Sequence, residues 1–249
     1  MAGELVVKIR LDRLLVQRGL VSIRSKAQDL IRRGAVRAGG AAALKAGQEV
    51  AADTVLEVLE TERYVARSAW KLKAALDAFG FEPRGLTCLD VGASTGGFTE
   101  VLLERGAARI LAVDVGRDQL HATLRANPKV VSLESTDARS LTAAMLPSPA
   151  GAIVCDVSFI SLLKVLPAVL PLAHAEAWLA ALVKPQFEVG RAAVGKGGIV
   201  RDEAAKEKAI QSVVAYIEQA GWTVRGTVRS PILGQDGNEE TLVGAIRNA

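Results

Sequence analysis

Short apolar runs alternate with segments of helical periodicity over most of the chain. Strands are expected near 87–91, 109–113, 130–134, 151–156 and 177–183, with helices between them. A helix over 202–219 follows, and strands at 222–229 and 241–246 are expected to form an antiparallel closing hairpin. Alternation of this kind predicts an α/β fold, in which helices cover both faces of a mostly parallel sheet.

The first sixty residues show a different pattern, with two short helices followed by strands. Leu11, Leu14 and Leu15 share one helical face, and a second helix is expected from a cap at Ser22 to Arg33. Strands near 36 and 55–59 complete a small α+β module. We therefore expect three parts: residues 1–60, a polar linker over 61–67, and a larger domain over 68–249 that begins with a helix.

One turn combines an acid and three glycines directly after a buried strand. Residues 89–98 read LDVGASTGGF, and the next apolar run ends in Asp114. Glycines let a backbone approach a ligand closely, and an acid at the end of the neighbouring strand can accept hydrogen bonds from a ribose. The glycine spacing differs from the dinucleotide fingerprint G-x-G-x-x-G and suits a nucleoside without a pyrophosphate, such as S-adenosylmethionine. From the residues alone, a dinucleotide site and a purely structural turn remain open.

Composition narrows the class of protein. Half of the 249 residues are hydrophobic and 23% are charged, which favours a folded core over disorder. Cys88 and Cys155 lie in apolar runs, so we expect them to be buried and reduced in a cytoplasmic protein. The cysteines and histidines form no metal-ligand pattern, and no uncharged run is long enough to span a membrane. We expect no metal site, no signal peptide and no stable membrane association.

Positive charge is concentrated near the start of the chain. Residues 8–37 contain nine basic side chains and only two acids, Asp12 and Asp29. Such a concentration indicates a surface that faces phosphates. A solvated helix face without a partner would show the same pattern.

Four charged residues at or near predicted element ends are candidates for chemistry. Asp156 and Lys184 follow buried apolar runs, and ligands of parallel sheets bind at the carboxyl ends of strands. Lys71 lies on the helix that begins the larger domain, and Glu240 precedes the last strand. Each has a plainer interpretation: Lys184 as a lysine reaching solvent from a strand end, Asp156 as a helix cap, and the other two as surface charges.

The basic module resembles the S-four-type RNA-binding domain. The matching positions are Arg10, Leu11, Asp12, Leu15, Gly19, Leu20, Ser25, Ala27, Leu30, Ile31, Gly34 and Val36, followed by a turn at Ala38, Gly39 and Gly40. The resemblance implies RNA as a partner. The basic residues expected to contact it are Arg10, Arg13, Arg18, Arg24, Lys26, Arg32, Arg33 and Arg67.

The chain from Tyr64 onward resembles the FtsJ-type ribosomal RNA methyltransferases, and both parts together are similar to the TlyA family, also called hemolysin A. The motifs are 89–99 (LDVGASTGGFT), 112–116 (AVDVG), 156–162 (DVSFISL), 182–188 (LVKPQFE), 195–202 (GKGGIVRD) and 230–234 (SPILG) with Gly237, Asn238 and Glu240. The resemblance implies a Rossmann-like sheet that binds S-adenosylmethionine, and a catalytic tetrad at Lys71, Asp156, Lys184 and Glu240. The implied cofactor residues are Asp90, Gly92, Ser94, Gly96, Gly97, Phe98, Asp114 and Asp137.

The resemblance further implies methyl transfer from S-adenosylmethionine to a ribose 2′-hydroxyl, with cytidine in ribosomal RNA or ribosomal subunits as the acceptor. Burial and a neighbouring ammonium both favour the neutral form of a lysine, so Lys184 beside Lys71 would take the hydroxyl proton. Asp156 would orient Lys184, and Glu240 would balance Lys71 and position the ribose. A non-catalytic RNA-binding protein and a membrane-active hemolysin are the alternative functions.

Overall fold

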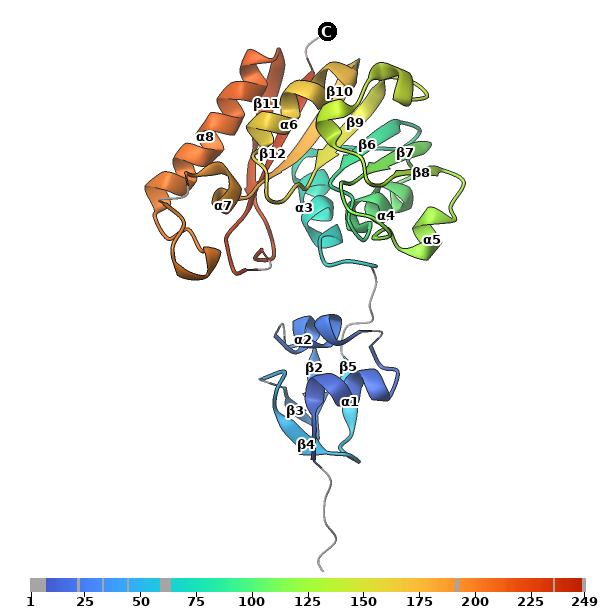
Figure 1. Cartoon of the computed structure of the whole chain (residues 1–249), viewed down its shortest axis with the longest axis vertical. Coiled ribbons are helices and arrows are strands. Elements are labelled where there is room, and N and C mark those ends of the chain that lie inside the picture. Colours follow the sequence, from blue (N-terminus) through green and yellow to red (C-terminus); the bar gives the residue numbers. More distant parts are fainter. Residues whose placement is uncertain are drawn as a thin grey trace, which may run out of the picture. The chain divides into compact units, whose positions relative to one another are not determined.

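The computed structural model describes residues 8–21, 23–32, 34–43, 45–58, 64–190, 193–234 and 236–247. The chain divides into a small unit (residues 1–63) and a large unit (residues 64–249), each of which is compact (Figure 1). The predicted cap at Ser22, the predicted RNA contact Arg33 and the start of the predicted linker, 61–63, lie outside the described residues. The division of the chain at residues 60 and 68 stays a prediction.

The small unit packs two helices against short antiparallel strands. Its elements are β1 (Lys8–Arg10), α1 (Leu11–Gln17), α2 (Arg24–Arg32), β2 (Val36–Ala38), β3 (Ala41–Ala42), β4 (Glu49–Ala51) and β5 (Leu56–Val58). Strand β2 pairs with both β3 and β5, and β1 pairs with β4. Leu11, Leu15 and Ile31 are at most 2% exposed in the centre of this unit, because the apolar faces of both helices point inward.

The large unit is built on a seven-stranded sheet with the order β11-β12-β10-β9-β6-β7-β8. Five neighbouring strands are parallel, and β12 runs antiparallel to both β10 and β11. The predicted mostly parallel sheet with an antiparallel closing hairpin is therefore confirmed. The strands are β6 (Thr87–Val91), β7 (Arg109–Val113), β8 (Val130–Leu133), β9 (Ala150–Cys155), β10 (Ala173–Val183), β11 (Trp222–Arg229) and β12 (Thr241–Arg247).

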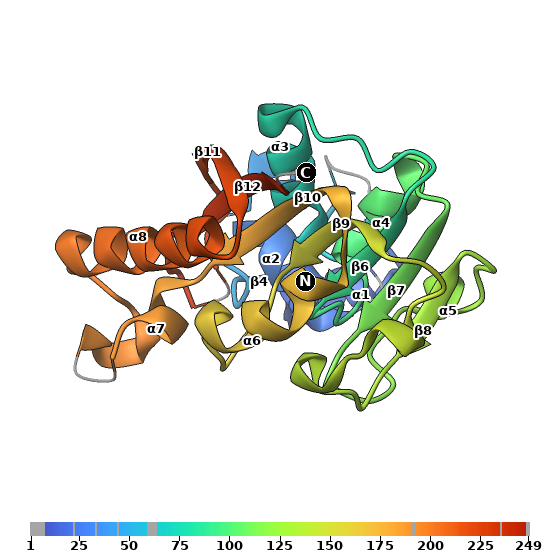
Figure 2. The ribbon, with the colours of Figure 1, turned by 90° about the horizontal axis from the view of Figure 1, so that it is seen from above.

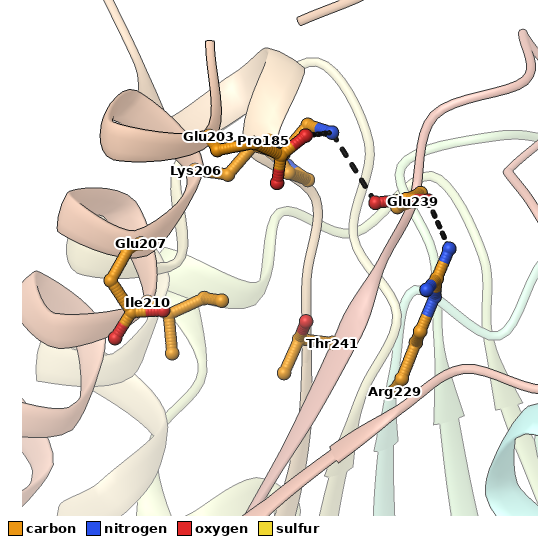
Figure 3. Close-up of a pocket in the computed structure, with 8 residues that line it drawn as sticks. All are labelled: Pro185, Glu203, Lys206, Glu207, Ile210, Arg229, Glu239 and Thr241. Carbon is orange, nitrogen blue, oxygen red and sulfur yellow. Dashed lines mark hydrogen bonds and ion pairs between the residues drawn. The ribbon is translucent and has the colours of Figure 1, made fainter. Parts of the chain in front are cut away.

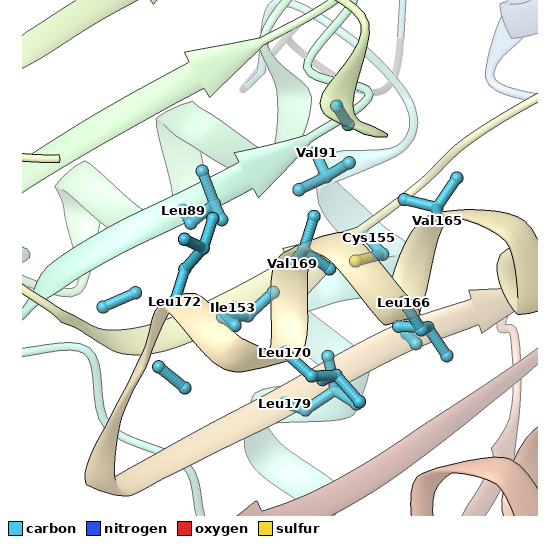
Figure 4. Packing of buried hydrophobic residues seen from close by; sticks show 14 of the residues in the cluster. Leu89, Val91, Ile153, Cys155, Val165, Leu166, Val169, Leu170, Leu172 and Leu179 are labelled. Carbon is cyan, nitrogen blue, oxygen red and sulfur yellow. The ribbon is translucent and has the colours of Figure 1, made fainter. Parts of the chain in front are cut away.

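Helices cover both faces of this sheet, as Figure 2 shows from above. On one face, α6 and α8 pack against Leu89, Ile153 and Leu179, and Figure 4 shows how closely the side chains of α6 meet the strands. On the other face, α3 and α4 pack against Cys88 and Val154. The helices are α3 (Ala69–Phe79), α4 (Gly97–Glu104), α5 (Ala122–Arg125), α6 (Leu162–Val169), α7 (Pro185–Glu188) and α8 (Glu203–Gln219), with short 3₁₀ turns at Ala138–Ser140, Ala143–Met145, Leu170–Leu172 and Lys196–Gly198.

Candidate active site

Four strands bring their ends to one edge of the sheet. Strands β6 and β9 pair up to their last residues, and the last residue of β10 lies opposite the first residue of β12. Asp156 and Lys184 directly follow β9 and β10, while Glu240 directly precedes the antiparallel strand β12. The register therefore gathers these three residues at the edge where parallel sheets bind their ligands.

A buried ion pair joins the first turns of α3 to the beginning of β12. The Lys71 Nζ atom lies 2.5 Å from Glu240 Oε2, and the two side chains are 6% and 2% exposed. Gly234 leaves space for the carboxylate, because a Cβ atom there would lie 2.6 Å from Glu240 Oε1. Both charges are thus interior groups, and each depends on the other for compensation.

A second ion pair lies at the ends of β9 and β10. The Lys184 Nζ atom is 2.6 Å from Asp156 Oδ1 and donates a hydrogen bond to Ser158 Oγ at 2.8 Å. The cap of α6 is Ser161, whose Oγ accepts a hydrogen bond from the Leu163 N–H, so Asp156 is available to the lysine. Ser158 belongs to the site although the sequence offers only a weak signal for it, its position two residues after Asp156.

The beginning of α3, and with it Lys71, is fixed by the start of α4. Gly97 makes this approach possible, because a Cβ atom there would lie 2.2 Å from Ser68 Oγ and 2.9 Å from the Ala69 nitrogen. The Val65 N–H also donates to the Glu100 carboxylate at 2.6 Å. The structure thus gives Gly97 a packing role, and its predicted contact with a cofactor stays a prediction.

The cofactor turn, residues 92–97, lies directly against the segment that carries Asp156. Gly92 has φ +84°, and a Cβ atom there would come within 2.5 Å of the Asp156 carbonyl oxygen. The Asp114 carboxylate at the end of β7 accepts hydrogen bonds from the N–H groups of Ser94 (2.8 Å) and Gly116 (2.7 Å). The turn and the acid of the neighbouring strand are therefore in contact, which is the arrangement that a nucleoside site needs.

Asp90, two residues before the first glycine, is a fully buried acid. The Thr99 hydroxyl donates to its Oδ2 at 2.6 Å, and Oδ1 has no hydrogen-bond partner among the described residues. Burial raises the pKa of Asp90 to about 7. Phe98 is 2% exposed and packs in the core, and its predicted contact with a cofactor stays a prediction. A buried acid with an unused acceptor beside a glycine turn fits a cofactor that bears an amino group, as S-adenosylmethionine does.

The loop beyond Asp114 is held by Ser94 together with two residues that the sequence did not identify, Gln119 and Glu134. Ser94 Oγ donates to Gln119 Oε1 at 3.1 Å, and the Gln119 N–H donates to Glu134 at 2.6 Å. Asp137 instead accepts hydrogen bonds from the side chain and the N–H of Arg139, whose guanidinium lowers the pKa of Asp137 to about 2. The predicted position of Asp137 near an adenine stays a prediction.

In the small unit a buried acid organises part of the basic surface. Asp12 is fully buried and accepts hydrogen bonds from Arg10 (3.0 Å), Arg24 (2.9 Å) and Gln28 (2.8 Å), while the two arginine side chains are 41% and 45% exposed. Burial works to raise the pKa of Asp12, but these hydrogen bonds outweigh it and hold the pKa well below its ordinary value. Asp12 thus holds Arg10 and Arg24 in place, while both side chains stay partly exposed to solvent.

The other predicted RNA contacts differ in what they bind within the chain. Arg18 donates to the backbone carbonyls of Ala52 and Thr54, so its guanidinium is committed to the small unit. Arg67 belongs to the large unit and donates to the Leu233 carbonyl at 2.6 Å. Of the remainder, Arg13 and Arg32 are exposed and Lys26 is partly buried.

A separate pocket of about 140 Å³ borders β12 on the side away from Glu240 (Figure 3). Glu239 and Thr241 line it, and side chains alternate along a strand, so Glu240 between them faces the other way. Glu239 pairs with Arg229 and, at 3.3 Å, with Lys206. This network ties the start of β12 to β11 and α8. The pocket is lined by Pro185, Glu203, Lys206, Glu207, Ile210, Arg229, Glu239 and Thr241.

Neither a membrane-spanning helix nor a metal site occurs among the residues that the structure describes. No helix there is long and apolar enough to cross a membrane. Over the same ranges, no group of three or more histidine, cysteine or acidic side chains is arranged to hold a metal ion.

Comparison with known proteins places the chain in a family. Residues 64–247 match the FtsJ-like methyltransferases, and residues 9–56 match the S4 domain. A protein of Mycobacterium tuberculosis named 16S/23S rRNA (cytidine-2'-O)-methyltransferase TlyA is 46% identical over 94% of this chain and 88% of its own length. Hemolysin A of Brachyspira hyodysenteriae is 39% identical over 96% of this chain and its whole length.

A solved structure agrees with these sequence matches. A Streptococcus thermophilus protein described as a hemolysin has a TM-score of 0.77 and 37% identity, over 98% of this chain and 90% of its own. The glycine turn, the acid after β7 and the family match agree on the cofactor, S-adenosylmethionine. The chain therefore belongs to the TlyA family of FtsJ-like, S-adenosylmethionine-dependent methyltransferases.

Proposed function

We propose that this enzyme methylates a ribose 2′-hydroxyl of ribosomal RNA, with cytidine as the acceptor nucleoside. The observation that supports it most is the Lys184–Asp156 pair, which lies at a strand end directly against the cofactor turn. A lysine in this place can act on a hydroxyl that approaches the methyl group. The relative from Mycobacterium tuberculosis, whose name states this reaction, supports the nucleoside and the RNA class.

In the proposed reaction the cofactor supplies an electrophilic methyl group, and the protein handles the proton of the acceptor. Lys184 Nζ is the group that takes the proton of the 2′-hydroxyl as the oxygen attacks. Asp156 and Ser158 hold that nitrogen from two sides, at 2.6 and 2.8 Å. The Lys71–Glu240 pair forms the neighbouring wall, at the beginning of β12. Alignment of the hydroxyl with the methyl group contributes more to the rate than proton transfer does.

The small unit is proposed to supply the affinity for RNA. A 2′-hydroxyl is present on every ribonucleotide, so the reacting group carries almost no information about sequence. The exposed guanidinium groups that Asp12 anchors are suited to bind phosphates. No observation among the described residues favours a membrane-active function, and the intact pairs of the site speak against a purely RNA-binding protein.

The test is methylation of purified ribosomal RNA and subunits with labelled S-adenosylmethionine by the wild type and Lys184→Ala. We expect the wild type to protect at least one cytidine linkage from alkaline cleavage, as a 2′-O-methyl group does. Loss of a general base typically costs about 10²–10⁴-fold in rate, so the variant should be nearly inactive while it still binds the cofactor. Lys208→Ala, on the exposed side of α8, is the matched control. A Lys184→Ala rate above about a tenth of wild type would exclude the proposed base.

A further inference from the structure

Two loops of the site are joined to each other at three points. Lys184, at the end of β10, contacts Asp156 and Ser158 in the loop after β9. The rings of Phe187 and Phe159 meet at a centroid distance of 5.2 Å. Beyond them a third contact is made by Glu188. The segment 184–188 therefore contacts the segment 156–162 along its whole length.

The contact through Glu188 fastens α7 to the start of α6. The Ser161 hydroxyl donates to Glu188 Oε2 at 2.5 Å, and the Leu162 N–H donates to Glu188 Oε1 at 2.8 Å. The carboxylate thus accepts from the cap residue of α6 and from one of the amide groups that a helix start leaves unpaired. Burial raises the pKa of Glu188 although both donors oppose this.

We propose that Glu188 is a positioning residue for the Lys184–Asp156 pair, an inference that rests on the proposed role of that pair in methyl transfer. Helix α7 is a single turn of four residues, and Lys184 immediately precedes it. A single turn has little stability of its own, so its orientation depends on what its ends bind. Glu188 ties the far end of this turn to α6, and α6 follows the loop that holds Asp156 and Ser158.

The geometry gives Glu188 no part in the proton transfer itself. Each of its carboxylate oxygens accepts a hydrogen bond from the α6 segment, and Lys184 takes its contacts from Asp156 and Ser158. A role in positioning differs measurably from a role in chemistry. It requires the two hydrogen bonds but does not require the negative charge.

The experiment compares Glu188→Ala with Glu188→Gln in the full chain. Glutamine can accept a hydrogen bond from the Leu162 N–H through its oxygen and donate one to Ser161 Oγ through its amide. Both hydrogen bonds between α7 and the start of α6 therefore remain without the negative charge. We expect Glu188→Ala to lose about tenfold to a hundredfold in kcat, since small misplacements of reacting groups cost this much. Glu188→Gln should stay within about threefold of wild type, and the KM for RNA and the Kd for S-adenosylmethionine should not change in either variant.

Hydrogen exchange supplies a readout besides activity. In Glu188→Ala the Leu162 amide should exchange faster, and in Glu188→Gln it should remain protected. Glu218→Ala, an exposed acid near the end of α8, is the matched control for removal of a carboxylate. If Glu188→Ala does not bind the cofactor, Ser161→Ala decides: a several-fold loss of kcat supports the proposal, and an unchanged kcat overturns it.

Two outcomes for the Glu188 variants also overturn the inference. One is a Glu188→Ala enzyme with kcat within twofold of wild type. The other is a Glu188→Gln enzyme as inactive as Glu188→Ala, which would show that the charge itself is needed. Failure of the proposed function has a different signature: a wild type that does not methylate ribosomal RNA, or a Lys184→Ala variant that does.

Discussion

The small and large units differ in whether the cation that pairs with a buried carboxylate is exposed or is itself buried. In the small unit the acid is inside: Asp12 is buried, while Arg10 and Arg24 are 41% and 45% exposed. In the large unit both partners are inside, since Lys71 and Glu240 are 6% and 2% exposed. An anchored but exposed guanidinium can bind a phosphate from solvent. A buried ammonium can act only on a group that enters the site.

The two units also show that burial alone does not set the charge of an acid. Asp12 and Asp90 are both fully buried, yet their pKa values shift in opposite directions. Asp12 accepts hydrogen bonds from two guanidinium groups and an amide, which stabilise the carboxylate. Asp90 accepts one side-chain hydrogen bond, from a hydroxyl, so desolvation dominates. The number and charge of the donors decide the outcome.

Removing the lysine of the buried Lys71–Glu240 pair should have the largest effect on stability. Lys71→Met leaves Glu240 as an uncompensated interior charge, so the free energy of unfolding should fall by about 3–5 kcal/mol. Arg24→Met, which removes a half-exposed cation, should cost less than about 1 kcal/mol. Tryptophan fluorescence in urea reports the first change, because Trp70, Trp178 and Trp222 all belong to the large unit. Amide hydrogen exchange reports the second.

The double variant Lys71→Met/Glu240→Leu sharpens this comparison. Replacing both charges removes the stranded carboxylate, so most of the missing stability should return. Equal costs for Lys71→Met and Arg24→Met would show that burial of the partners makes no difference, and the contrast between the units would fail.

The two buried aspartates should respond to pH with opposite signs. The folded pKa of Asp90, about 7, lies above its ordinary value of 3.8, so its contribution to stability is complete below pH 4 and is lost as the pH rises through 7. Against Asp90→Asn, the wild type should lose about 1.4 kcal/mol for each pH unit across this window. Urea unfolding of both proteins at pH 5, 6 and 7 measures this difference.

Asp12 provides the reverse case. Its folded pKa lies below the ordinary range, so its stabilising effect is present at neutral pH and is lost only in strong acid. Asp12→Asn should therefore be less stable than wild type at pH 7, with a difference that stays constant down to about pH 4. Parallel pH curves for the Asp90 and Asp12 variants would contradict the assignment of opposite shifts.

The smallest expected effect concerns the exposed arginines. Arg10→Gln/Arg24→Gln should weaken binding of ribosomal RNA and reduce the slope of log K against log salt by about 0.7–0.9 for each phosphate that the variant no longer binds. Filter binding at several salt concentrations gives this slope, and the Kd for S-adenosylmethionine should not change. The control is Arg109→Gln, because Arg109 is the first residue of β7 and lies at the opposite end of that strand from the candidate site. An unchanged slope would mean that Asp12 anchors a surface without an RNA partner.

Periodicity predicted most of the sheet, and the exceptions have physical reasons. Strands β6, β7 and β11 have the predicted bounds, since each forms a short patterned run between turn residues. Strand β10 begins at Ala173, whereas the prediction began it at residue 177. The prediction missed the first residues because they include the exposed His174 and Glu176. These exposed polar residues lie at an irregularity in the pairing of β10 with β9, between Ala173 and Trp178, and they look like a loop in the sequence.

The candidate site was predictable where it depends on residue type at strand ends, and not where it depends on contacts between loops. Lys184 and Asp156 follow buried runs, which marks them in the sequence. Glu188 and Ser161 are 27 residues apart, and nothing in either segment indicates that they meet. In the small unit, nothing in the sequence indicates that the guanidinium of Arg18 donates to two backbone carbonyls, and its predicted contact with RNA stays a prediction.

The place of β12 has a consequence for when the enzyme becomes active during its synthesis. This strand follows every other described element in the chain, yet lies between β10 and β11 in the sheet. Lys71 is translated 169 residues before its partner Glu240. A nascent chain can therefore form its cofactor turn while the neighbouring wall of the site is still missing. We expect a growing chain to be inactive until β12 has left the ribosome and paired with β10 and β11.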